Sequence, residues 1–121
     1  MKISLMRRLK VTYRPEAQTD FRDIYMYVLT RSGDKAMAEG FYQRIRTRCE
    51  RIGLVPLGGR PRDDLEPGLR TVPFERTAVI AYKVEDESVR VTNIFYGGRD
   101  YEAIYHGVPE DEDERQGSDF D

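Results

Sequence analysis

The sequence predicts an α+β domain in which an N-terminal strand and an α-helical hairpin pack on a small, mostly antiparallel β-meander, forming a two-layer sandwich. Two stretches before residue 53 carry apolar residues at helical spacing, and only a few residues separate them. Three β-prone runs follow, joined by short polar connections. With 121 residues, the chain is long enough for one modest hydrophobic core and too short for two.

A short strand and a first helix are expected at the start of this domain. Residues 10–13, KVTY, alternate polar and apolar side chains as a strand does. Pro15 suits the first turn of a helix, and Glu16 lies favourably close to its N-terminal end. We therefore expect an amphipathic helix over residues 15–31, ending near Gly33, with an apolar stripe made of Ala17, Phe21, Ile24, Tyr25 and Val28.

A second helix follows almost at once. Asp34 is a good N-cap residue, and a second apolar stripe ends before Gly53. Because only a few residues separate the two helices, we expect them to fold back as an antiparallel hairpin. The second stripe consists of Ala38, Phe41, Ile45, Cys49 and Ile52.

The second half of the chain predicts a loop and then a β-meander. Residues 56–68, PLGGRPRDDLEPG, are rich in proline, glycine and charge, which is typical of a loop exposed to water. The three β-prone runs cover residues 69–74, 77–84 and 89–96. Connections as short as those between them favour antiparallel hairpins.

For two of the predicted strands, the sequence also indicates the position of the strand in the sheet. Pro73 lacks an N–H group, so the first run is expected to be an edge strand or a bulged one. Residues 78–84 are apolar at nearly every position, as in a central strand covered on both faces. The residues expected to pack against the helices from the sheet are Val72, Phe74, Val79, Ala81 and Val91.

Charge is distributed unevenly along the chain. The chain has 20 basic and 22 acidic residues, yet residues 109–121 alone hold seven of the acids and one arginine. We expect this acidic tail to be disordered, and residues 10–108 to form the folded domain after an N-terminal extension, residues 1–9. The preceding 108 residues then carry a net charge of +4, which favours an acidic partner without distinguishing nucleic acid from protein.

Neither a membrane segment nor a secretion signal is expected. No stretch approaches the roughly 20 apolar residues needed to cross a bilayer. Residues 1–10 are basic but lack a sustained apolar stretch and a small-residue cleavage site, and Met6 is an alternative start to Met1. The single Cys49 cannot form an internal disulfide, which suits a reducing compartment. We therefore expect a soluble, cytoplasmic protein.

Several chemistries are disfavoured by the residues present. One histidine and one cysteine provide neither a metal site nor a thiol–imidazole pair. We expect His106 to be an exposed histidine near the C-terminal end and Cys49 to be a small helix residue. The glycines of GGRPR and YGGRD match neither a P-loop nor a dinucleotide fingerprint, so no cofactor is expected. Asp63 and Asp64 lie in a polar loop, where nothing is expected to shift the pKa of a carboxyl group, so hydrolysis by a pair of carboxyl groups is not favoured.

Arginines near the sheet are the best candidates for a functional surface. Arg60 and Arg62 lie in the loop before the first meander strand, and Arg70 shares a strand face with Val72. Arg99 follows a double-glycine exit from the last strand. These four arginines could form one basic rim, because forked guanidinium donors bind phosphate or carboxylate oxygens in pairs.

A structural role is the alternative for each of these arginines. Arg99 could pair with Asp100 or with a loop acid and so hold the exit of the last strand. Arg60 and Arg62 could likewise be bound within the protein. The crowd of arginines between residues 44 and 62 is expected to form mainly a solvated helix face.

Five motifs occur in a specific order over about residues 11–105: YRPEAQTDFRDIYMY, GLVPLGGRPR, GLR, VIAYKV and FYGGRDY. In this order and spacing the chain resembles the ParE branch of the RelE/ParE superfamily, the toxic halves of bacterial type II toxin–antitoxin pairs. The fold implied by the resemblance is also a helical hairpin on an antiparallel meander. It agrees with the architecture predicted from periodicity.

The resemblance leaves two activities open, and a non-toxic descendant that only binds its antitoxin is a third alternative. RelE-like members cleave messenger RNA in the ribosome, whereas ParE-like members bind and inhibit DNA gyrase. A ribonuclease of this kind would use Arg70, Arg99 and Tyr105, but Val72 and Val79 stand where it would offer a lysine and an arginine. Losing one preorganised donor costs on the order of a hundredfold in rate. We therefore favour a non-enzymatic gyrase inhibitor, with target contacts from Arg60, Arg62, Arg70 and Arg99.

The resemblance also implies a protein partner. A ParD-like antitoxin would neutralise the toxin in a hetero-oligomer, and no direct sequence-specific binding to nucleic acid is expected. An acidic or amphipathic antitoxin segment would lie over the helical hairpin and the rim of the sheet. Tyr25, Tyr27 and Tyr42 are candidate anchors because they combine apolar area with a hydroxyl group, and core filling is their alternative role.

Overall fold

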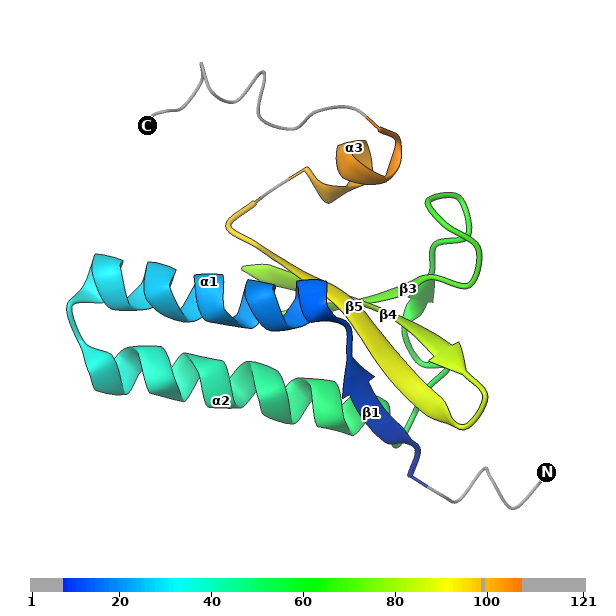
Figure 1. Ribbon diagram of the computed structural model, residues 1–121, viewed down its shortest axis with the longest axis horizontal. Coiled ribbons are helices and arrows are strands. Elements are labelled where there is room, and N and C mark those ends of the chain that lie inside the picture. Colours follow the sequence, from blue (N-terminus) through cyan, green and yellow to red (C-terminus); the bar gives the residue numbers. More distant parts are fainter. Residues whose placement is uncertain (1–7, 99, 108–121) are drawn as a thin grey trace.

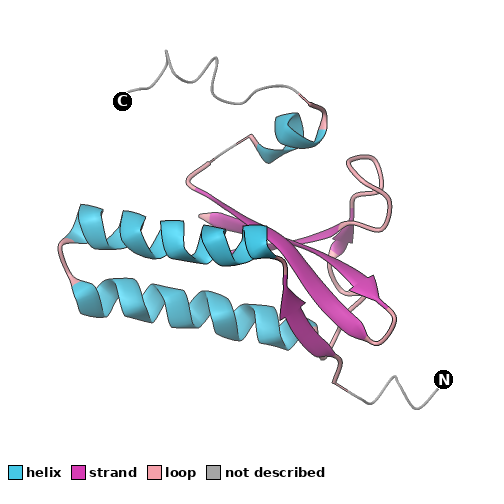
Figure 2. Ribbon diagram, in the orientation of Figure 1, coloured by secondary structure: helices cyan, strands magenta, loops and turns pink. Residues whose placement is uncertain are grey.

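The computed structural model describes residues 8–98 and 100–107. Figure 1 shows the two long helices running side by side as a hairpin, with α3 beyond the end of β5. Figure 2 shows the strands gathered at one side of this hairpin. The predicted α+β class is confirmed, with elements in the order β1 (Lys10–Tyr13), α1 (Pro15–Ser32), α2 (Lys35–Ile52), β2 (Arg60–Pro61), β3 (Arg70–Phe74), β4 (Ala78–Glu85), β5 (Ser88–Tyr96) and α3 (Tyr101–Tyr105).

The hairpin helices begin and end where the local chemistry predicts. Pro15 occupies the start of α1, where its missing N–H group costs nothing. Gly33 follows the end of α1 with a φ of 68°, a left-handed cap that glycine adopts without strain. The side chain of Asp34 then accepts hydrogen bonds from the N–H groups of Ala36 and Met37 and so caps α2.

The sheet has five strands in the order β1-β5-β4-β3-β2. The predicted meander is confirmed, because β3 pairs antiparallel with β4, and β4 with β5. Strand β1 joins the far side of β5 in parallel. Two short elements were not predicted: β2, which lies in the stretch expected to be a loop, and α3, which follows the glycine exit from β5.

Both faces of the sheet are covered, by two separate hydrophobic clusters. The larger cluster lies between the sheet and the helical hairpin and contains Val72, Phe74 and Val91, as expected. Val79 and Ala81 were expected there too, but that prediction is wrong: Ala81 belongs to the second cluster and Val79 packs against it. Side chains alternate along β4, so these two residues point away from the helices. The second cluster consists of Leu65, Leu69, Ala81 and Phe95, with Val79, Tyr101 and Tyr105 packed against it.

A bulge in β5 changes which side chains face the helices. The pairing between β4 and β5 skips one residue, Thr92, on β5. Val91 before the bulge and Ile94 after it therefore both lie in the larger cluster, although three positions separate them. Simple alternation, used in the sequence prediction, does not anticipate this spacing.

Within the described ranges, none of the helices combines the length and the apolar character that crossing a membrane would require.

Candidate functional site

Arg70 and Tyr82 together hold the loop that connects α2 to β2. They are paired across β3 and β4. Nη1 of Arg70 donates to the carbonyl oxygens of Leu57 at 3.1 Å and Gly59 at 2.8 Å. The Tyr82 hydroxyl donates to the carbonyl oxygen of Pro56 at 2.8 Å and accepts the N–H of Gly59 at 2.9 Å. Part of the hydrogen-bonding capacity of Arg70 is therefore used inside the protein.

Gly59 is the residue that this anchoring requires. A Cβ atom at this position would lie 2.5 Å from the Tyr82 hydroxyl oxygen and 2.8 Å from a carbon of its ring. Contacts that short would force the ring and the loop apart, so glycine permits the close approach. The second glycine of the motif GGRPR is therefore required by the packing of this loop against Tyr82.

Arg60 is exposed at the edge of the sheet. It lies in β2 and pairs in register with Thr71 of β3. Within the described part of the chain, its side chain makes no hydrogen bond or ion pair. The hydrogen bond from Arg62 is the main cause that lowers the pKa of Asp64, and the charge of Arg60 is a lesser one. Arg60 therefore remains available for an external partner.

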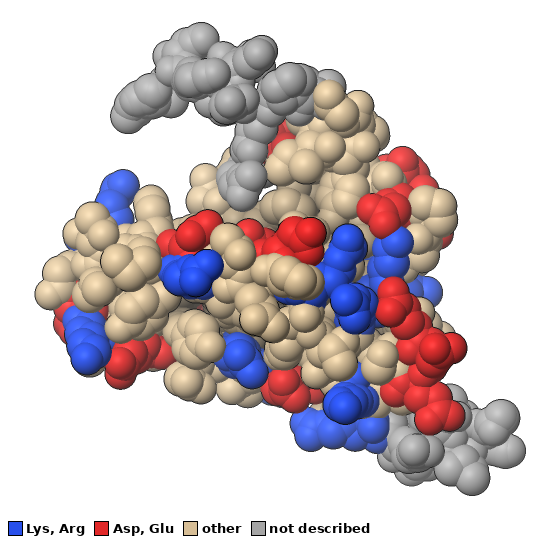
Figure 3. All heavy atoms as spheres, viewed as in Figure 1, with Lys and Arg blue, Asp and Glu red and all other residues tan. Residues whose placement is uncertain are grey.

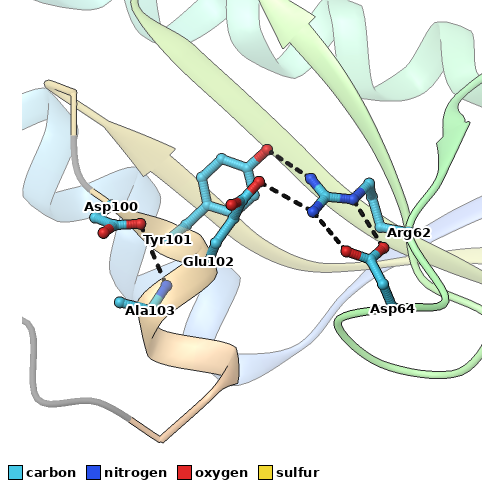
Figure 4. Close-up of polar contacts among 6 residues, drawn as sticks. All are labelled: Arg62, Asp64, Asp100, Tyr101, Glu102 and Ala103. Carbon is cyan, nitrogen blue, oxygen red and sulfur yellow. Dashed lines mark hydrogen bonds and ion pairs between the residues drawn. The ribbon is translucent and has the colours of Figure 1, made fainter.

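Arg62 is buried, with only 6 % of its surface exposed, and fastens α3 to the loop before β3. Figure 4 shows its guanidinium group between the two segments. Nε and Nη2 donate to the carboxylate of Asp64 at 3.0 and 2.8 Å. Nη2 also lies 3.0 Å from a carboxylate oxygen of Glu102, and Nη1 donates to the Tyr101 hydroxyl at 3.4 Å. Hydrogen bonding to Asp64 is the main cause that raises the pKa of Arg62 above its usual value.

These positions correct the expectation of one basic rim. Arg62 cannot offer its guanidinium group to a target, because that group is enclosed and already bound to two internal carboxylates. Arg60 and Arg70 both lie near the start of β3, but Arg60 is free and Arg70 is partly bound. Arg99 and the acidic tail, residues 109–121, lie outside the described residues.

The ribonuclease alternative needs Arg70 and Tyr105 close together, and the structure does not bring these two described residues together. Arg70 lies on the sheet face that also carries Val72 and the helices. Tyr105 packs edge-on against Phe95 on the opposite face, with ring centroids 6.0 Å apart. Its hydroxyl is buried and has no hydrogen-bond partner among the described residues. Burial is the main cause that raises its pKa, and the nearby Thr92 side chain opposes this effect.

The expectation about the two valines also needs a correction. Val72 is 5 % exposed in the helix-side cluster, whereas Val79 lies on the other face of the sheet. The two residues cannot border one cleft, so they do not show that a phosphate site has lost two cations. The separation of Arg70 from Tyr105 is a better argument against such a site.

The three tyrosines proposed as anchors differ in exposure. Tyr27 is 43 % exposed, and the guanidinium carbon of Arg31 lies 5.3 Å from the centre of its ring. Tyr25 and Tyr42 are partly buried, with ring centroids 6.4 Å apart. Tyr42 also packs edge-on against Phe21 of the larger cluster, at 5.4 Å. Tyr27 is thus the most accessible of the three, and Tyr42 also contributes to core packing.

The arginines of α2 divide into bound and unbound groups. Arg44 donates two hydrogen bonds to Glu75, at 2.8 and 3.1 Å. Arg46 lies over three aromatic rings, with 4.8 Å to the nearest ring centre. Arg48 and Arg51 make no hydrogen bond or ion pair within residues 8–98 and 100–107. Figure 3 shows basic side chains gathered along the lower edge of the molecule, around the C-terminal end of α2.

A hollow beside these unbound arginines was not predicted from the sequence. We call it the α2 groove and define it by six of its lining residues: Arg48, Arg51, Leu54, Val55, Val72 and Tyr82. Its volume is about 480 Å³. The sequence contains both parts of this hollow: the arginines between residues 44 and 62 and the apolar stretch LVPL at residues 54–57. They could not be combined without knowing that the end of α2 lies beside β3.

No metal site is found in the described residues: within 8–98 and 100–107, no three His, Cys, Asp or Glu side chains come close enough together to hold an ion. Cys49 is fully buried, and burial raises the pKa of its thiol to about 12. His106 is exposed, as expected.

Comparisons with known proteins agree with this architecture. A structure described as the chromosomal ParDE TA system from P. aeruginosa matches with a TM-score of 0.66 and 21 % identity, covering 74 % of this chain and 97 % of that one. Protein HP0894 from Helicobacter pylori matches with a TM-score of 0.38 and 12 % identity, over 73 % and 93 % of the two chains, which is too distant to support an argument. The first likeness concerns the fold alone. No curated protein matched the chain.

Family membership follows from the sequence itself. The model of the family described as "ParE toxin of type II toxin-antitoxin system, parDE" matches residues 11–101, well over half of the chain. The match spans most of β1, the helical hairpin and the whole meander. The chain therefore belongs to the ParE toxin family of type II toxin–antitoxin systems.

Proposed function

We propose that this toxin acts in the cytoplasm by binding and inhibiting DNA gyrase, and that a ParD-like antitoxin neutralises it in a hetero-oligomer. The family to which the chain belongs supports the toxin role. The description of the same family names a toxin–antitoxin system, which supports an antitoxin partner.

One observation carries the proposal that the chain binds its target rather than cleaving RNA. Arg70 and Tyr105 lie on opposite faces of the sheet, and the Tyr105 hydroxyl is buried. Cleavage of a phosphodiester needs donors aimed at one reacting group, because charge develops there in the transition state. Two side chains separated by a sheet cannot act on the same phosphate.

Among the described arginines, Arg60 is the best candidate for a target contact. It is exposed, it has no partner within the described residues, and it lies beside the partly bound Arg70. Arg62 is no longer a candidate for a target contact, because its guanidinium group is enclosed. The proposal for Arg99 stands as an expectation from the sequence.

Two assays in parallel test the proposal. Purified toxin, freed of antitoxin, should inhibit supercoiling by gyrase and leave messenger RNA intact on programmed ribosomes. Arg60→Glu should weaken inhibition, whereas Arg76→Glu, an exposed change in the turn between β3 and β4, should not. Cleaved message with normal supercoiling would instead establish the ribonuclease activity and overturn the proposal.

A further inference from the structure

Three arginines in one region of the molecule have no internal acceptor. Arg48 and Arg51 on α2 and Arg60 on β2 make no hydrogen bond or ion pair within the described part of the chain. Arg44, one turn earlier on α2, is by contrast already paired with Glu75. The region therefore favours an acidic ligand, because forked guanidinium donors bind carboxylate oxygens in pairs.

These three arginines border one continuous surface. Arg48 and Arg51 line the α2 groove, whose volume is about 480 Å³. Gly59 also lines this groove, and Arg60 is the next residue along the chain. An extended acidic segment could therefore run past Arg60 and enter the groove without leaving the surface.

The groove also offers apolar surface close to its charges. Leu54 and Val55 line it and are 52 % and 62 % exposed. An apolar side chain placed against them would gain about 25 cal/mol for each Å² removed from water. The best-matched ligand thus carries an apolar side chain with carboxylates beside it.

The acidic tail of this chain carries such a sequence. Residues 119–121 are Asp, Phe and Asp, so the phenyl ring of Phe120 stands between two carboxylates. Over residues 109–121, one arginine and seven acids give a net charge of −6, whereas the preceding 108 residues carry +4. The opposite charges of tail and domain attract each other.

The fold places the start of the tail within reach of these arginines. Nη2 of Arg62 lies 3.0 Å from a carboxylate oxygen of Glu102 and so holds α3 beside the loop before β3. Arg62 comes two residues after Arg60, and Gly107 comes five residues after Glu102. Summing these backbone steps and the two side chains, Gly107 lies at most about 30 Å from Arg60.

The tail is long enough to cover this path. Fourteen residues follow Gly107, and fully extended they span up to about 48 Å. The acidic run that ends at Glu114 extends up to about 25 Å from Gly107, so its side chains can meet the long side chain of Arg60. Residues 119–121 can then reach the groove, which begins at the neighbouring Gly59.

Covalent attachment makes even a weak contact of this kind well populated. A segment tethered by a short flexible linker has an effective concentration of about 1 mM, so a contact with a dissociation constant of about 0.1 mM is occupied about nine times in ten. A tail that is disordered by composition can dock in this way, because its ordering is offset by the contacts it makes.

We propose that the acidic tail folds back on its own domain, with residues 110–114 beside Arg60 and the ring of Phe120 in the α2 groove near Arg48 and Arg51. The docked tail then competes with any other acidic ligand of this surface and lowers its apparent affinity in proportion to the free fraction. This inference goes beyond the proposed function and does not depend on which macromolecule the toxin inhibits.

A fluorescent reporter in the full-length chain tests the contact. The sequence contains no tryptophan, so Phe120→Trp introduces a single one. Its emission should be blue-shifted, and its acrylamide quenching constant should be at least about threefold lower than in a free peptide of residues 108–121 with the same change. Raising the salt concentration from 0.1 to 1 M should remove most of this protection, because the screening length falls from about 10 to about 3 Å.

Charge variants of the domain locate the contact. Adding Arg48→Glu and Arg51→Glu to the reporter protein should return its quenching to that of the free peptide, because attraction becomes repulsion. Lys35→Glu with Arg76→Glu changes the net charge equally at exposed positions that do not line the groove, and should preserve the protection. Thermal unfolding checks that each variant folds, and Arg48→Gln with Arg51→Gln serves if charge reversal prevents folding.

Three outcomes would overturn the proposal. The first is a reporter as accessible in the full-length protein as in the free peptide, together with amide NMR signals of residues 118–121 that match the peptide in the unsubstituted chain. The second is protection that survives the changes at Arg48 and Arg51, which would place the tail elsewhere. The third is protection that grows with protein concentration, which would show that the tail binds a second copy. None of them changes the expected result of the gyrase and messenger RNA assays.

Discussion

The carboxylate of Asp20 on α1 accepts the backbone N–H of Ile94 on β5 at 2.8 Å. This N–H group lies just after the bulge at Thr92, where the ladder between β4 and β5 is interrupted. A side chain from the helix layer thus satisfies a donor of the strand layer. The contact ties the helical hairpin to the sheet at the point where the register of β5 changes.

Asp20→Ala should therefore lower the free energy of unfolding by about 1–3 kcal/mol, because a partly buried N–H group would lose this acceptor. Asp20→Asn should cost less, since its amide oxygen can still accept. Urea unfolding followed by circular dichroism measures both variants. Equal losses for the two would mean that the negative charge of Asp20, rather than this hydrogen bond, provides its stabilisation.

Arg62→Met should release α3 without unfolding the helical hairpin. The substitution keeps apolar volume but removes the contacts to Asp64, Glu102 and Tyr101. Hydrogen exchange should become faster in residues 101–105 and stay unchanged in α1 and α2. Arg60→Met, at an exposed position two residues earlier, is the matched control. Unchanged exchange in α3 would show that packing on Phe95 alone holds this helix.

The sequence predicted those parts of the fold that depend on neighbouring residues. The two apolar stripes and the caps at Gly33 and Asp34 are local signals, and they correspond to observed features except that Tyr25 of the first stripe lies outside the larger cluster. The meander followed from short connections between β-prone runs. Which side chains face which side of the sheet was predicted less well, because the second face is covered by elements that the sequence prediction missed: α3, and Leu65 in a stretch expected to be exposed to water.

The candidate site was predicted less well, for the same reason. The enclosure of Arg62 depends on Glu102, which lies 40 residues further along the chain and comes close only through α3. The α2 groove needs the end of one helix beside an edge strand. Residue types and spacing identified the arginines as important, but they could not show which of them were already bound.

Arg46→Ala should destabilise the junction of β1 with the helical hairpin. Its guanidinium carbon lies 4.8 Å from the ring centre of Tyr13, 5.4 Å from Phe21 and 5.9 Å from Tyr42. Partly desolvated cation–π contacts contribute about 1–2 kcal/mol, so a loss of that order is expected in thermal or urea unfolding. Arg48→Ala, two residues on and without such contacts, should change stability by less than about 0.5 kcal/mol. Similar losses for both would rule out the aromatic contacts as the cause.

Stability should fall at alkaline pH because of buried tyrosines. Burial is the main cause that raises the pKa of Tyr82 and of Tyr13, whose hydroxyl also donates to Glu50 at 2.8 Å. Unfolded tyrosines lose their protons near pH 10, while these folded ones keep theirs. The free energy of unfolding should therefore decrease as the pH rises from about 10 towards the folded pKa values. Tyr82→Phe and Tyr13→Phe should each flatten this decrease in urea unfolding measured across that range. An identical slope in the wild type and both variants would mean that other groups control the alkaline transition.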